Sequence, residues 1–262
     1  MSKLWDQILL VPTVVRLASR APRDPAAGWD GYWRGIHTTG RSGDVLWDSG
    51  SQAEHAQYSD AVKAHFDPAL PVIDVGCGNG TYTRWLAGLF PSVLGIDVST
   101  GAVELAKKES EGVQNADFMV MDAARAGAGE HLLELLGPAN VFVRGVFHVL
   151  RPDKQCSLAA NLRTVIGGSG RVFLAETDFQ GNSLAYLQQL GATRRRIPRQ
   201  LQNALKNLPR PGRFGVQERQ RTFPDSGWQL IADGPVNIEV VPMKSTSLSQ
   251  QVPGYFALLA GK

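Results

Sequence analysis

The chain has 262 residues, of which 43% are hydrophobic and 19% charged, and its formal net charge is +3. This composition excludes an intrinsically disordered chain and is typical of a single globular domain with a well-filled core. The small net charge does not indicate a polyanionic partner, and no nucleic-acid partner is expected.

The two cysteines, Cys77 and Cys156, have no metal-ligand spacing to a histidine. We therefore expect no metal site, and a reducing cytoplasm is the simplest location for the chain. The apolar run at residues 8–11 ends at Pro12 and is too short to span a bilayer, so we expect no membrane span. It is expected to pack as an amphipathic cap, and contact with a membrane surface stays open. Nothing in the sequence predicts the oligomeric state.

From residue 72 onward, short apolar runs alternate with helical patterns. The expected strands are residues 72–75, 93–98, 118–121, 141–146 and 171–175, and the expected helices are residues 81–90, 99–110, 130–136 and 153–166. Strands separated by helices require right-handed crossovers. The pattern therefore predicts an α/β fold with a Rossmann-like, mostly parallel sheet and helices on both faces.

The end of the chain departs from this alternation. A helix is expected at residues 225–232, followed by strands at residues 237–241 and 254–259. Because only a loop separates these two strands, we expect an antiparallel C-terminal hairpin at the sheet edge.

Two segments lack the strand–helix alternation altogether. Residues 1–65 are rich in Gly, Trp and polar residues and are predicted to form an N-terminal cap over the carboxyl ends of the strands. Residues 66–262 form the predicted main domain, with a basic lid inserted at about residues 179–222.

A glycine-rich loop, with Gly76, Gly78 and Gly80, connects the first expected strand to the first expected helix. Glycines let a backbone turn sharply and approach a ligand closely, and the helix N-terminus beyond them offers unpaired N–H groups. On its own, such a loop is equally typical of a tight turn that binds nothing.

Three acids, Asp74, Asp97 and Asp122, lie near the ends of the first three expected strands. The carboxyl ends of neighbouring parallel strands border the ligand crevice of an open sheet. There Asp97 can accept both hydroxyls of a ribose, and Asp122 can accept from an adenine amine. The loop and the acids together predict a site for an adenosine-containing cofactor.

A nicotinamide dinucleotide is the alternative cofactor, and two features disfavour it. The position that requires a third glycine in the dinucleotide fingerprint is Thr81, and Asp74 stands beside the loop that would hold a pyrophosphate. In addition, Leu190 occupies the place of the lysine that a Tyr186-x-x-x-Lys pair would need.

The segments VIDVGCGNGTYTRWLA, GIDVS and MDAA resemble the motifs of class I S-adenosylmethionine-dependent methyltransferases, over residues 72–176. The resemblance implies S-adenosyl-L-methionine as the cofactor and methyl transfer to a small-molecule acceptor. It implies that Gly76, Gly78 and Gly80 line the methionine portion and that Asp74 orients its ammonium group, directly or through water.

The resemblance extends to the adenosine portion. Asp97 would hold the ribose, and the adenine would be bordered by Val98, Met121, Asp122 and Ala123. Arg144 departs from the pattern, because many relatives carry Asn or Asp at this position. For Arg144 we therefore expect only a backbone contact to the cofactor.

The cap has a tryptophan pattern, Trp29-x-x-x-Trp33 followed by Trp47, that looks like the aromatic cap of small-molecule members of this family. Trp33, Trp47 and His37 are thus candidates for the substrate or cap side of the site. The tryptophans are equally typical of core anchors within the cap.

A general base is needed only if the acceptor loses a proton as it attacks. His148 is the first candidate, because the loop after the fourth strand borders the transferred methyl group in this family. A structural histidine at a strand end is an equally good interpretation. His37, His55 and Glu176 are weaker candidates.

The segment at residues 194–221 carries nine Lys or Arg residues and one acid, Glu218. It is interpreted as a solvated helical lid or as a surface that attracts an anionic acceptor. Nucleic acid is disfavoured, because Phe214 is the one aromatic residue of the segment. A cofactor-binding protein of the same fold that does not transfer methyl remains the alternative function.

Overall fold

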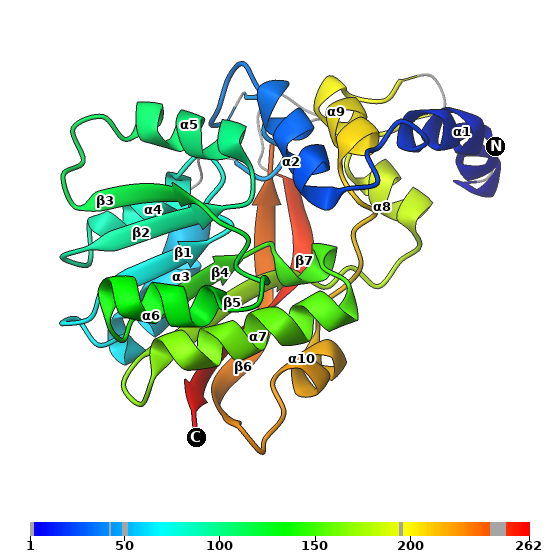
Figure 1. Cartoon of the computed structure of the whole chain (residues 1–262). Helices are drawn as coiled ribbons and strands as arrows, with labels where there is room; N and C mark the ends of the chain where they lie inside the picture. Colours follow the sequence, from blue (N-terminus) through cyan, green and yellow to red (C-terminus); the bar gives the residue numbers. More distant parts are fainter. Residues whose placement is uncertain (1–2, 42, 49–51, 194–195, 242–249) are drawn as a thin grey trace.

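The computed structural model describes residues 3–41, 43–48, 52–193, 196–241 and 250–262. Within these ranges the chain forms a seven-stranded sheet with the order β3-β2-β1-β4-β5-β7-β6 (Figure 1). The strands are β1 (Val72–Val75), β2 (Val93–Asp97), β3 (Ala116–Val120), β4 (Asn140–Arg144), β5 (Arg171–Thr177), β6 (Trp228–Val240) and β7 (Gln250–Gly261). The first five strands are parallel, whereas β7 runs antiparallel to both β5 and β6. The predicted mostly parallel sheet with an antiparallel C-terminal pair is confirmed.

Helices cover both faces of this sheet. They are α1 (Lys3–Ala18), α2 (Pro25–Arg34), α3 (Gln52–His65), α4 (Thr81–Ala87), α5 (Thr100–Glu109), α6 (Ala128–Leu136), α7 (Pro152–Ile166), α8 (Ser183–Gln189), α9 (Arg199–Asn207) and α10 (Val216–Thr222), with a 3₁₀ turn η1 (Phe147–Val149). One face packs against α6, α7 and α10, and the other against α3, α4 and α5. A hydrophobic core lies on each face of the sheet, and the side chains of β4 alternate between the two. Val141 and Val143 face α7, whereas Phe142 packs against Tyr58 of α3.

Four helices, α1, α2, α8 and α9, lie over the carboxyl ends of the strands, and we call them the cover (Figure 1). Helix α1 packs on α8 and α9, and α2 packs on α9 and α5. Neighbouring residues determine where α2 begins. The Asp24 carboxylate caps the helix by accepting from the backbone N–H groups of Ala26 and Ala27, and Pro25 occupies the first turn. The cover thus joins the first helices of the chain to helices about 150 residues later in the sequence.

The helix expected at residues 225–232 is wrong, because β6 already begins at Trp228 and continues for 13 residues. Its pairing with β7 runs from Trp228 opposite Gly261 to Val240 opposite Gln250, so a long partner strand overrides the local helical pattern. The helix before β6 is instead α10, which packs beside α7. The segment expected as one lid at residues 179–222 therefore divides into α8 and α9 in the cover and α10 on a sheet face.

No helix in the described part of the chain is both long and apolar enough to cross a lipid bilayer.

Candidate functional site

A cavity of about 920 Å³ lies between the carboxyl ends of the strands and the cover. Ligand sites of α/β proteins are expected at this edge of the sheet. The sequence-predicted residues that line it are Trp33, Trp47, Gly76, Asp97, Val98, Met121, Asp122, Ala123, Arg144 and His148. The fold therefore gathers most of the predicted residues around one space.

Four predicted residues do not line this cavity. Asp74, Gly78 and Gly80 lie behind its wall, and His37 is exposed on the surface of the cap segment. His55, a weaker candidate for a base, stacks on Trp85 with ring centroids 5.3 Å apart and does not line the cavity either.

The glycine loop can be built only from glycines at its two most crowded positions. Gly76 and Gly78 have φ angles of 75° and 54°, in the left-handed region that disfavours other residues. A Cβ on Gly76 would lie 2.4 Å from Cγ2 of Val146, and one on Gly78 would lie 2.7 Å from Cζ2 of Trp33. The backbone of the loop is therefore in direct contact with side chains that line the cavity.

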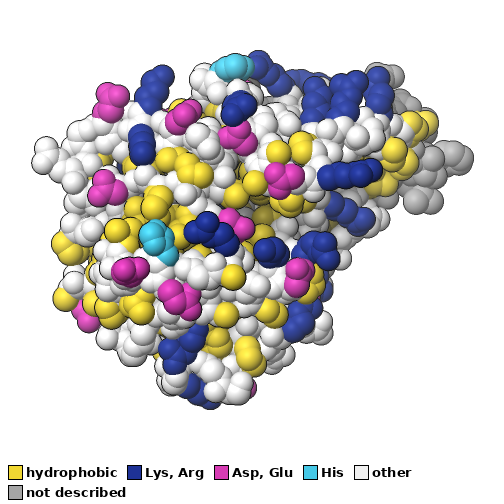
Figure 2. All heavy atoms as spheres, viewed as in Figure 1, with side chains coloured by type: hydrophobic (Ala, Val, Ile, Leu, Met, Phe, Trp, Pro, Cys, Tyr) yellow, Lys and Arg dark blue, Asp and Glu magenta, His cyan; other side chains and the backbone are white. Residues whose placement is uncertain are grey.

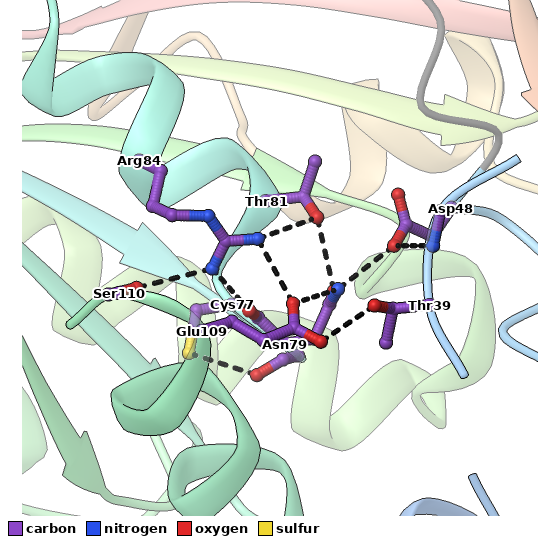
Figure 3. Close-up of polar contacts among 10 residues, drawn as sticks. Thr39, Asp48, Cys77, Asn79, Thr81, Arg84, Glu109 and Ser110 are labelled. Carbon is purple, nitrogen blue, oxygen red and sulfur yellow. Dashed lines mark hydrogen bonds and ion pairs between the residues drawn. The ribbon is translucent and has the colours of Figure 1, made fainter. Parts of the chain in front are cut away.

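Asn79 ties this loop to three other segments (Figure 3). Its Nδ2 donates to Asp48 of the cap segment at 2.9 Å and to Glu109 of α5 at 3.1 Å. Its backbone oxygen accepts from Arg84 of α4 at 2.7 Å, and Arg84 in turn forms an ion pair with Glu109 at 3.2 Å. The network holds the loop in place through side chains of the protein. Sequence reasoning missed it because its partners lie far apart along the chain.

Asp97 links the glycine loop to the second strand. Its Oδ2 accepts from the backbone N–H of Gly78 at 3.0 Å, and its Oδ1 accepts from that of Ser99 at 2.9 Å. Burial raises the pKa of Asp97 to about 6. Each oxygen keeps further acceptor capacity on the cavity side, where a hydroxyl-bearing ligand could donate to it.

Asp74 is buried behind the loop, and its Oδ2 accepts from the Thr83 hydroxyl at 2.6 Å. Burial raises the pKa of Asp74 to about 7. No positively charged side chain of the described residues forms an ion pair with it. A cation bound in front of the loop would therefore favour its ionised form.

The aromatic residues of the cap form a cluster that closes the cavity beside the loop. Tyr32 stacks on Trp47 with centroids 5.2 Å apart, and Trp33 meets both rings edge-on. Trp33 is 3% exposed, yet its indole Nε1 has no hydrogen-bond partner among the described residues. A buried donor without an acceptor is costly, and a ligand acceptor would satisfy it.

On the far side of the loop, Asp122 follows β3 and borders the cavity together with the apolar side chains of Val98, Met121 and Ala123. Its Oδ1 accepts from the backbone N–H of Ala124 at 2.9 Å, which orients the carboxylate. A flat ring bearing an amine fits this combination of apolar walls and one acceptor.

His148 and Glu176 form a hydrogen-bonded pair at the wall of the cavity. Nδ1 of His148 lies 2.7 Å from Oε2 of Glu176, which is completely buried at the end of β5. The same carboxylate accepts from the backbone N–H groups of Val146, Phe147 and His148. Because an ionised carboxylate only accepts, it assigns the proton to Nδ1 and leaves Nε2 as the acceptor.

Arg144 makes a contact that the sequence did not predict. Its Nε and Nη2 donate to the two oxygens of Glu54 on α3 at 2.7 and 3.0 Å, and both side chains are buried. Glu54 also accepts from the Tyr58 hydroxyl and from the backbone N–H of Glu239. The charge of Arg144 is thus compensated within the fold while the residue still borders the cavity.

The part of the cavity under α8 and α9 is lined mainly by apolar side chains, and we call it the apolar chamber. Its walls include Leu187, Leu190, Leu201, Ile238, Val240 and Val252. Tyr186 and Thr177 are among the few polar side chains there. The chamber would hold a molecule with a largely apolar body.

Known proteins with similar sequences are methyltransferases. A family model described as "Methyltransferase domain" matches residues 72–170. A ubiquinone biosynthesis O-methyltransferase from Sinorhizobium fredii is 28% identical over 117 residues, or 41% of this chain and 47% of that protein. Methyltransferase nsrG from Aspergillus novofumigatus is 23% identical over 189 residues, 67% of each chain. The match thus spans about half the length of the first relative and two thirds of the second.

Solved structures of methyltransferases are similar to this chain over most of its fold. A SAM-dependent methyltransferase from Anabaena variabilis aligns with a TM-score of 0.78 and 27% identity, covering 92% of this chain and 97% of its own. Magnesium protoporphyrin IX methyltransferase from Synechocystis with bound SAH aligns with a TM-score of 0.52 and 18% identity, covering 80% of this chain and 84% of its own.

Proposed function

We propose that this chain, which belongs to the class I S-adenosylmethionine-dependent methyltransferases, transfers the methyl group of its cofactor to a small organic acceptor with a largely apolar body. The observation that carries the proposal is that one cavity is lined by Gly76, Asp97 and Asp122 and also by His148, whose Nδ1 contacts the buried Glu176. Cofactor recognition and proton removal can therefore meet at one place.

The residues present fit S-adenosylmethionine in three respects. Gly76 has no side chain and lines the cavity, so a ligand can approach its backbone closely. The buried Nε1 of Trp33 lacks an acceptor, which a ligand carboxylate could supply. The uncompensated carboxyl of Asp74 lies behind the loop and favours a nearby cation.

We assign the cofactor groups accordingly. Gly76 and Gly78, with Trp33, would hold the methionine portion, and Asp74 would act on its ammonium group through its charge. Asp97 would accept the ribose hydroxyls, since it lines the cavity and each of its oxygens, which accepts one backbone N–H, has capacity for a further donor.

The adenine would lie by the end of β3. There the Asp122 carboxylate would accept from its exocyclic amine, between the apolar walls of Val98, Met121 and Ala123. Gly80 would serve the turn into α4, where its φ is 79°.

The cofactor, when bound, supplies an electrophilic methyl group for in-line displacement. Nε2 of His148 would take the proton of the acceptor hydroxyl, thiol or amine as that group attacks. Glu176 holds Nδ1 and stabilises the imidazolium that results. The cover and the apolar chamber would exclude water and align the acceptor, which is the protein's other contribution to such a reaction.

Calorimetry with S-adenosylmethionine and S-adenosylhomocysteine tests cofactor binding directly. Incubation with a panel of aromatic and aliphatic hydroxy, thiol and amino compounds, followed by mass spectrometry of the demethylated cofactor and methylated product, tests transfer. Product formation with an apolar acceptor supports the proposal. Binding of both cofactor forms without turnover of any acceptor would favour a protein of this fold that binds the cofactor but transfers no methyl.

A further inference from the structure

One side of α1 exposes large apolar side chains to solvent. Leu9, Val11 and Val15 are 50%, 38% and 59% exposed, whereas Leu10 and Leu17 of the same helix are buried beneath them. Buried hydrophobic residues already anchor α1 to the rest of the cover, so the exposed ones are not needed for its packing. Exposed apolar residues grouped on one helix mark an interaction surface.

Basic residues flank this apolar side. Exposed arginines of this region are Arg16, Arg20 and Arg23, on α1 and just after it, and Arg196, Arg199 and Arg210, on or beside α9, which contacts α1. Figure 2 shows Lys and Arg side chains gathered over the α1 and α9 side of the molecule, next to exposed hydrophobic side chains. We call these six arginines with Leu9, Val11 and Val15 the basic cover surface.

The segment that contributes α8 and α9 to the cover carries charge of one sign. Residues 179–217 contain no Asp or Glu, although they contribute α8 and α9 to the cover. Within the described ranges, Arg16, Arg20 and Arg199 form no ion pair with a carboxylate. A partner that fits must therefore be anionic and must also accept apolar side chains.

We propose that the basic cover surface docks on the anionic surface of a lipid bilayer. An interfacial helix binds a membrane by burying its apolar face at the level of the headgroups while flanking Lys and Arg residues contact anionic lipids. A single-stranded nucleic acid fits less well, because it requires exposed aromatic residues for stacking and Phe214 is completely buried.

The position of α1 connects this docking to the cavity. Val14 and Ala18 of α1 are among the residues that line the cavity. A docked bilayer would therefore lie next to the cover of the apolar chamber. An apolar acceptor could then pass from the bilayer into the chamber. This last step rests on the proposed function, whereas docking itself does not.

Sedimentation of the full chain with vesicles tests the proposal. We expect binding to vesicles of phosphatidylcholine mixed with phosphatidylglycerol, weak binding to phosphatidylcholine alone, and loss of binding at high salt. The charge reversal R16E/R199E should lower the partition coefficient by roughly tenfold or more, since each cation near an anionic surface contributes about fivefold. The apolar variant V11S/V15S should lower it several-fold.

Matched controls separate this surface from general effects. L135S removes an exposed leucine of α6, and K107E/K108E reverses two exposed charges on α5, which Figure 1 places far from α1. Both should bind vesicles like the unaltered chain. Equal losses in the controls, equal binding to both vesicle types, or binding to single-stranded RNA but not to vesicles would overturn the proposal. Calorimetry with S-adenosylhomocysteine on the same samples reports separately on the proposed function.

Discussion

His148 and Glu176 are 28 residues apart in the sequence, and a 2.7 Å contact between Nδ1 and Oε2 joins them at the wall of the cavity. Three backbone N–H groups also donate to this carboxylate, so its position is fixed from several directions. The pair therefore presents Nε2 in one orientation, which a general base requires.

Replacement of His148 tests this role. We expect H148Q to lower kcat by roughly 10²–10⁴-fold with any acceptor that must lose a proton, because the glutamine side chain cannot take up that proton. Calorimetry should give an unchanged dissociation constant for the cofactor. The exposed His131 on α6 provides the control H131Q, which should retain full kcat. Activity of H148Q close to that of the unaltered enzyme would assign His148 a structural role only.

The close contact between Gly78 and Trp33 predicts a selective loss of cofactor binding. In G78A the new methyl group meets the indole at 2.7 Å, so Trp33 must move from its place beside the loop. We expect the dissociation constant for S-adenosylhomocysteine, measured by calorimetry, to rise by about tenfold or more.

Gly112 offers a matched control, because its φ is also positive (92°) and a Cβ there would meet nothing within 4 Å. Both G78A and G112A should lose about 1–2 kcal/mol of stability through backbone strain. If G112A weakened cofactor binding as much as G78A, the contact with Trp33 would not be the cause.

The buried acids predict a pH dependence of stability in the absence of ligand. Burial raises the pKa of Asp74 to about 7 and that of Asp97 to about 6. An acid whose folded-state pKa is raised stabilises the fold below its unfolded pKa and loses this contribution as the pH rises through the folded value. The free energy of unfolding of D74N should therefore exceed that of the unaltered chain by roughly 1–3 kcal/mol at pH 8. The difference between the two proteins should be smaller at pH 5.

Denaturant titrations at both pH values measure this difference, with the exposed D117N as the control. The same variant should bind the cofactor more weakly at pH 8, because its side chain carries no charge for the ammonium group. A D74N variant that is less stable than the unaltered chain at pH 8 would contradict an uncompensated buried carboxylate.

Because Arg144 and Glu54 form a buried ion pair, we expect the effects of replacing them on stability to depend strongly on each other. Loss of one partner leaves the other charged and unpaired inside the fold, so R144L and E54L should each lose about 3–5 kcal/mol. The double variant should lose clearly less than the sum of the two, as urea titrations of all four proteins would measure. Additive losses would show that the two side chains do not depend on each other.

Much of the sheet could be predicted from the sequence, because buried parallel strands appear as short apolar runs between helices. The antiparallel pair β6 and β7 was also expected, although the helix at residues 225–232 was wrong. Trp228, Leu230 and Ile231 have a spacing that suits a helix, and pairing with β7 decides otherwise. A prediction from the local sequence fails here because β7, the strand that stabilises β6, is distant from residues 225–232 in the sequence.

The site was predictable in part for a related reason. Gly76, Asp97 and Asp122 lie at or just after the ends of strands that must meet at one edge of a parallel sheet, so their gathering was expected. The contacts of His148 with Glu176 and of Arg144 with Glu54 depend on how helices and strands distant in sequence pack. Spacing along the chain contains no information about them.

The acceptors and donors around Glu54 also constrain the order in which the chain can assemble. Glu54 lies on α3, but its partners Arg144 and Glu239 follow 90 and 185 residues later. Closing loops of this length costs entropy before the contacts repay it. The contact of α3 with Glu239 can therefore form only once β6 has joined the sheet, so the first half of the chain completes its packing with the help of its last part.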